Sequence, residues 1–82
     1  MKLSKDSRDE LIRDYRLSPR EVELLELILE GTDSNAQLAR RMGIKVGTVK
    51  QYLHVLFAKF GVSSKVALIV GVCETSAGFT EI

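Results

Sequence analysis

The sequence predicts an all-α protein built from four or five short helices. Apolar residues recur every three or four positions through most of the 82 residues, and this spacing gives a helix one buried face. Serines that can cap a helix precede several of these segments, and glycines follow them. Only the β-branched stretch 66–72 is typical of a strand, and a lone strand would have no neighbour to pair with. We therefore assign that stretch to a helix as well.

The clearest helix signals surround the segment 18–31. Ser18 can cap a helix, and Pro19 fits its first turn. Glu21, three residues after the serine, completes a capping box. Apolar residues then recur at helical spacing until Gly31, which can end the helix in a left-handed conformation.

The next two predicted helices form a helix-turn-helix arrangement. Asp33 or Ser34 starts a short helix that Gly43 ends, and a turn of two residues follows. A longer helix then runs from about Val46 to Phe60, where Gly61 stops it. A short helix, a glycine-containing turn and a longer helix are the parts of a motif that places its second helix in the major groove of DNA.

Two further helices flank these three. One begins after Ser63, a candidate N-cap, and runs to about Glu74. An extra N-terminal helix can form over 6–15, with Leu11, Ile12 and Tyr15 as its apolar contacts. We expect residues 1–16 to be a helical extension, 17–75 to be the DNA-binding domain and 76–82 to be a C-terminal tail.

The helix 46–60 has one apolar face and one polar face. Its apolar stripe consists of Val49, Leu53, Leu56 and Phe60, with Tyr52 and Phe57 at the margins. On the polar face, Lys50 can donate to guanine or to a phosphate, and Gln51 can pair with adenine. His54 can do either, depending on its protonation. Ser34 and Thr48 lie near helix N-termini, where phosphate contacts are favoured.

The charges are distributed unevenly along the chain. The net charge is +1, but residues 34–73 carry six lysines or arginines and no acidic residue. Such a segment produces a local positive field that suits an anionic partner.

The composition excludes several other classes of protein. The length allows one domain, no apolar run reaches 18 residues, and the N-terminus lacks the apolar stretch of a signal peptide. We expect a cytoplasmic protein, because the single Cys73 can form no internal disulfide. With one histidine, one cysteine and no phosphate-binding loop, we expect no enzyme activity, metal, cofactor or small-molecule substrate.

Three sequence blocks also indicate a family. Residues 17–21 (LSPRE), 48–50 (TVK) and 59–62 (KFGV) occur in this order, with glycines at 31 and 43 between them. From Leu17 to Ile69 the sequence resembles the C-terminal DNA-binding domain of the LuxR family, also called the FixJ/NarL or GerE type. The resemblance implies a four-helix domain whose third helix lies in the major groove, in a stand-alone regulator or a piece of a longer one.

The resemblance also implies roles for single residues. Positions matching Lys50, Gln51 and His54 face the bases in this family, and the last helix commonly forms a dimer contact. Positions near the phosphate backbone match Asn35, Lys45, Thr48 and Lys65.

The sequence departs from the family pattern at several points. One residue is inserted between Gly31 and Ser34, so the first turn between helices should be longer than usual. Lys45 stands where a serine or threonine usually caps the recognition helix, so we expect that cap to be lost. Tyr52 and Val55 replace a frequent histidine and a frequent asparagine. These changes leave the target sequence undetermined.

The last predicted helix is apolar all round. Residues 66–73 contain no charge. One side of such a helix packs on the core of its own domain, and the apolar side that remains needs another surface to cover it. We expect a second copy of the chain to cover it around a two-fold axis. The residues assigned to this contact are Val66, Ile69, Val70 and Cys73. The alternative is that the N-terminal segment covers this face.

Two other functions remain open. A domain like region 4 of a sigma factor shares the 17–21 block and would read a promoter element while bound to RNA polymerase. A protein-interaction module could keep the fold and have lost DNA binding. Binding to duplex DNA that weakens with salt would favour the expected partner, double-stranded DNA, over the second of these. RNA polymerase is a further partner that a transcription regulator can contact.

Overall fold

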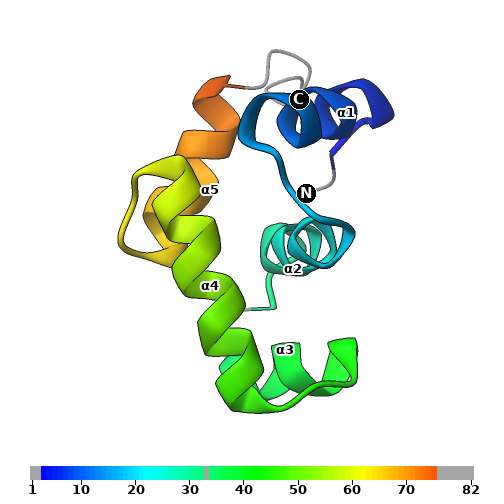
Figure 1. Cartoon of the computed structure of the whole chain (residues 1–82), viewed down its shortest axis with the longest axis vertical. Helices are drawn as coiled ribbons and strands as arrows, with labels where there is room; N and C mark the ends of the chain where they lie inside the picture. The colour runs from blue at the N-terminus through cyan, green and yellow to red at the C-terminus, as the bar shows by residue number, and fades with distance from the viewer. Residues whose placement is uncertain (1–2, 33, 76–82) are drawn as a thin grey trace.

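The computed structural model describes residues 3–32 and 34–75, and the predicted tail 76–82 lies outside this range. The described residues form five helices and no strand, which confirms the all-α prediction (Figure 1). The extra N-terminal helix is also present. The helices are α1 (Lys5–Tyr15), α2 (Pro19–Leu29), α3 (Asn35–Met42), α4 (Val46–Phe60) and α5 (Lys65–Thr75).

The long helix α4 runs along one side of the molecule (Figure 1). Helices α1 and α5 lie near its C-terminal end, α3 lies at its N-terminal end, and α2 lies between these two groups. Within the described residues no single helix is both long and apolar enough to cross a membrane, although α4 and Lys65–Cys73 meet that test jointly as a pair bent by 42°.

Helix α2 is the centre of the hydrophobic core. Seven of its eleven residues are buried, and it contacts α3, α4 and α5. The other four helices each bring apolar side chains to the same core, so the domain has one continuous hydrophobic cluster. The side chains with essentially no exposure are Leu24, Leu25, Leu38, Val49, Leu56, Leu68 and Val72.

Serine side chains begin four of the helices. Ser18 and Glu21 form the predicted capping box, in which each side chain accepts a hydrogen bond from the other residue's backbone N–H. Ser34 caps α3, so of the two predicted starting residues, Asp33 and Ser34, the serine is the N-cap. Ser4 caps α1 in the same way.

The predicted cap of the last helix was wrong by one residue. Ser64, not Ser63, accepts from the N–H of Ala67 at 3.1 Å, and its carbonyl accepts from the N–H of Leu68 at 2.9 Å. Two adjacent serines have the same capping chemistry, so the local sequence does not distinguish them. Placing the buried side chains Leu68 and Val72 on the core decides the register of the helix.

Candidate nucleic-acid interface

Helices α3 and α4 form the predicted helix-turn-helix. Gly43 ends α3 in the left-handed conformation, with φ +69°, and the N–H of Ile44 donates to the carbonyl of Ala39 at 3.0 Å. Ala39 is buried where α3 packs, and Val49 of α4 is completely buried in the same core. The turn is therefore closed by backbone hydrogen bonds and held by apolar contacts on its inner side.

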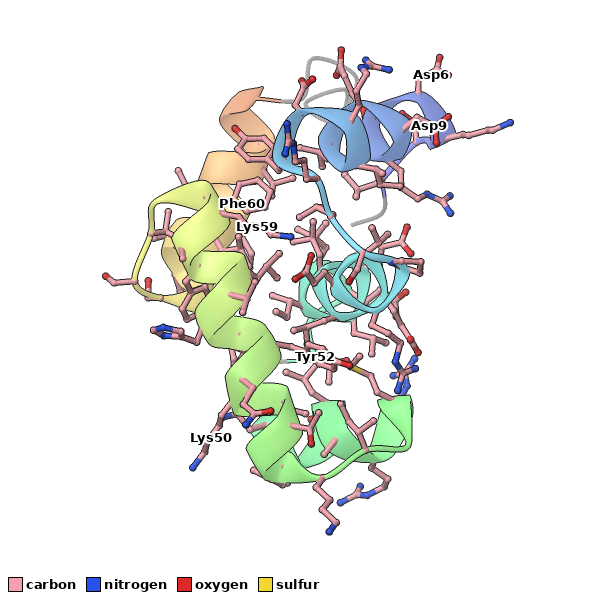
Figure 2. The ribbon with its side chains drawn as sticks, in the orientation of Figure 1. Asp6, Asp9, Lys50, Tyr52, Lys59 and Phe60 are labelled. Atoms are coloured by element: carbon pink, nitrogen blue, oxygen red, sulfur yellow. The ribbon has the colours of Figure 1, made fainter. Side chains whose placement is uncertain are left out.

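The outward face of α4 carries the three residues predicted to read bases. Lys50, Gln51 and His54 are all exposed, and Lys50 points away from the body of the molecule (Figure 2). Tyr52, on the adjacent side of the helix, points inward towards α2 and α3. Gly47 and Ala58 flank these three residues along the helix, and both are exposed and small, so the backbone of α4 can approach a surface closely at these two points.

The N-terminus of α4 has no side-chain cap. Lys45 occupies the N-cap position with an extended backbone, and no side chain accepts a hydrogen bond from the first-turn amides. This confirms the expected loss of the cap. Lys45 itself is exposed and Thr48 is partly buried. Uncapped N–H groups at a helix N-terminus, together with a lysine, provide donors for an anion such as a phosphate.

A second group of predicted phosphate contacts lies at the N-termini of α3 and α5. The ammonium group of Lys65 donates to the side-chain oxygen of Asn35 at 2.7 Å, across 30 residues of sequence. Ser34 precedes Asn35, and its hydroxyl oxygen accepts from the N–H of Gln37 at 3.4 Å. Ser34, Asn35 and Lys65 therefore come together, although 30 residues of sequence separate Asn35 from Lys65.

Carboxylates on and next to α2 pair with some of the positively charged side chains and leave others without a carboxylate partner. Three glutamates on this helix and Glu30, its C-cap residue, each pair with one cation, from α1, α2, α3 or α4. The pairs are Glu26 with Arg8, Glu23 with Arg20, Glu30 with Arg41, and Glu21 with Lys59. Over the described ranges, Arg40, Lys45 and Lys50 have no carboxylate partner. These three cations, on α3, in the turn and on α4, thus lie at the helix-turn-helix end, while Asp6 and Asp9 lie at the far end on α1 (Figure 2).

The C-terminal end of α4 is fixed by Lys59. Its ammonium group donates to the carboxylate of Glu21 at 2.7 Å and to the carbonyl of Arg16 at 2.8 Å. Burial raises the pKa of Glu21, but hydrogen bonds from Lys59 and from the backbone of Ser18, with the positive charge of Lys59, outweigh burial and hold this pKa below its ordinary value. Glu21 is therefore an ionised, buried anchor for α4.

An aromatic contact adds to this anchor. The rings of Tyr15 and Phe60 stack with their centroids 4.2 Å apart and their planes at 21°. Helix α1 thus packs on the end of α4, and Lys59 and Phe60 lie side by side at this junction (Figure 2). The sequence predicted that Tyr15 makes apolar contacts, but it did not indicate that the partner is Phe60.

Part of α5 stays uncovered. Val66 is 72% exposed and Val70 is 49% exposed, while Ile69 and Cys73 are partly buried against the core. The N-terminal segment does not cover the two valines, since both are exposed. All four residues predicted for a dimer contact lie on α5, and the two valines leave an apolar strip in solvent.

The comparisons with known proteins agree with this geometry. A family model described as bacterial regulatory proteins of the luxR family, GerE, matches residues 15–72. Neither the curated proteins nor the solved structures gave a significant match. The matched range begins at the end of α1, includes the helix-turn-helix and ends within α5. Because the match covers well over half of the sequence, the chain belongs to the luxR family of bacterial regulatory proteins.

Proposed function

We propose that this luxR-family regulator binds double-stranded DNA sequence-specifically, as a cytoplasmic homodimer, with α4 in the major groove. The observation that carries the proposal is the exposed face of α4, where Lys50, Gln51 and His54 project from a helix without acidic side chains. The major groove is wide enough to admit an α-helix, and these side chains are donors or acceptors for base edges.

The phosphate contacts would flank this helix on two sides. Lys45 and Thr48 lie at the uncapped start of α4, and the group Ser34, Asn35 and Lys65 lies at the paired starts of α3 and α5. Phosphate contacts fix the register of a protein on the duplex, and base contacts then supply the specificity. We propose these five residues as the positioning contacts and the three on α4 as the reading contacts.

The proposed dimer would form through α5. Val66 and Val70 are exposed one turn apart, and Ile69 and Cys73 border them. A two-fold axis through this strip would cover the apolar residues and present two copies of α4 to two half-sites. Replacing Val70 with glutamate should then give monomers in sedimentation equilibrium, while an unchanged dimer mass, or a monomeric wild type, would reject this interface.

The DNA-binding test begins with duplexes selected from a random library by the purified protein. Lys50→Ala and Gln51→Ala should each weaken binding to the selected duplex by about 1–3 kcal/mol. Lys5→Ala is the matched control, because Lys5 is an exposed lysine on α1 at the far end of the molecule. We expect no change in affinity for this control.

Three outcomes separate the functions. Recovery of an inverted repeat supports a dimeric, sequence-reading regulator. Equal losses in all three variants would mean that α4 does not read the bases. The absence of any binding at about 50 mM salt, where phosphate contacts are strong, would reject DNA binding and favour a protein-interaction module.

A further inference from the structure

The side chain of Arg20 links α2 to the last residue of α3. One guanidinium nitrogen donates to the carbonyl of Met42 at 3.1 Å, and another donates to the carboxylate of Glu23 at 2.9 Å. The first of these bonds spans 22 residues of sequence. Among the described hydrogen bonds, it is the side-chain bond that reaches the backbone where α3 meets the helix-turn-helix turn.

The carbonyl of Met42 is a sensitive point for the geometry of the motif. It belongs to the last turn of α3, whose carbonyls have no partner further along the helix. Gly43 and two further residues separate it from Val46, the first residue of α4. Because Gly43 has φ +69° and no atom within 4 Å of the site of a Cβ, the turn has no side-chain packing of its own at this residue. The contact at Met42 therefore adds a link to α2 at the start of the turn, beside the backbone hydrogen bonds and apolar contacts that close it.

We propose that Arg20 is a positioning residue that sets the direction of the recognition helix by holding the end of α3. Glu23 orients the planar guanidinium, whose two nitrogens then act as a fork between α2 and the turn. The inference rests on the proposed function for its readout in DNA binding, but the contact itself can be tested without DNA. Arg20 touches no base in this proposal and acts through the turn.

The effect should appear in specificity more than in overall affinity. Base contacts require aligned hydrogen bonds, whereas non-specific binding depends on the phosphate charge and tolerates small rotations. A recognition helix that leaves the turn at several angles would lose the aligned base contacts and keep the non-specific binding to phosphates. The quantity to measure is therefore the ratio of the affinity for a selected duplex to the affinity for a scrambled duplex of the same composition.

The test uses three variants of the full chain. Arg20→Met removes the donors and the charge but keeps an apolar stem. Arg8→Met is the matched control, because it removes an arginine of similar exposure that pairs with Glu26 of α2 away from the turn. Arg20→Lys keeps the charge and one donor for Met42, so it should recover most of the ratio.

We expect Arg20→Met to lower the ratio at least fivefold relative to Arg8→Met, which is about the smallest loss that corresponds to one base contact. Hydrogen exchange, measured by NMR, should be faster at the amides of Gly43 and Ile44 in Arg20→Met than in Arg8→Met. An unchanged ratio overturns the proposal even where exchange is faster. If the wild type discriminates no sequence, the proposed function fails, and equal exchange in the two variants would then also overturn the positioning role.

Discussion

Replacing Lys59 with methionine removes the ammonium group that holds the end of α4, while its hydrocarbon stem is largely kept. The lost contacts are the hydrogen bonds to the carboxylate of Glu21 and to the carbonyl of Arg16. Glu21 is only 6% exposed, so its charge would lose its nearest cation without gaining full access to water. The variant should therefore unfold more easily than the wild type.

The size of the effect follows from the exposure of the ammonium group. Hydrogen bonds to charged groups contribute about 1.5–3 kcal/mol each, but the Lys59 side chain is 29% exposed, and water can replace part of the lost interaction. We therefore expect a loss of about 2–3 kcal/mol in the free energy of unfolding. For a domain of this size, each kcal/mol lowers Tm by about 4–8 °C, so Tm should fall by roughly 8–24 °C.

Urea denaturation followed by circular dichroism measures this loss. Arg13→Met is the control, because Arg13 pairs with Asp14 at 3.8 Å and both side chains are mostly exposed. Such a surface pair contributes about 1 kcal/mol at most. A double-mutant cycle with Glu21→Gln gives the coupling between Lys59 and Glu21 and separates it from the contact with Arg16.

The effect should depend on pH in one direction. The pKa of Glu21 in the folded state lies below its ordinary value of 4.5, so the ionised carboxylate contributes stability above that value and loses the contribution as the pH falls through the folded pKa. The difference between the wild type and Lys59→Met should thus be constant near pH 7 and shrink in acid. A difference no larger than that of Arg13→Met, or one that grows in acid, would refute this account of the anchor.

Other predictions concern the turn, the α1 contact and the DNA backbone. Gly43→Ala should lower the free energy of unfolding by about 1–2 kcal/mol in urea denaturation because of its positive φ, whereas Gly47→Ala, in the first turn of α4 with open space around it, should raise it by up to about 0.5–1 kcal/mol. A change of the same sign in both variants would contradict the turn conformation. Tyr15→Leu should cost about 0.5–1.5 kcal/mol through loss of the stack on Phe60, and a neutral result would show that α1 does not hold α4. Lys45→Ala should reduce the slope of log affinity against log salt by about one, and an unchanged slope would remove Lys45 from the phosphate contacts.

Local sequence signals were sufficient to predict the elements of the helix-turn-helix. The bounds Val46–Phe60 of α4, the capping box of α2 and the left-handed Gly43 all agree with the structure. Caps, glycines and the apolar period act within about one or two helical turns, so a single sequence contains them in full. The exposed face of α4 follows from the same period, since burying Val49 and Leu53 turns Lys50 and Gln51 outward.

The tertiary structure decided how distant side chains share charge and hydrogen bonds. Nothing near Glu21 in the sequence indicates that its partner is Lys59, 38 residues away, and nothing near Asn35 indicates Lys65. The sequence located a positively charged segment, but which of its cations lack a carboxylate partner depends on where the glutamates of α2 and of its C-cap lie after packing. Helix periodicity fixes the face on which a residue lies, whereas the pairing between faces depends on how the helices cross, and that is set by the packing of the whole core.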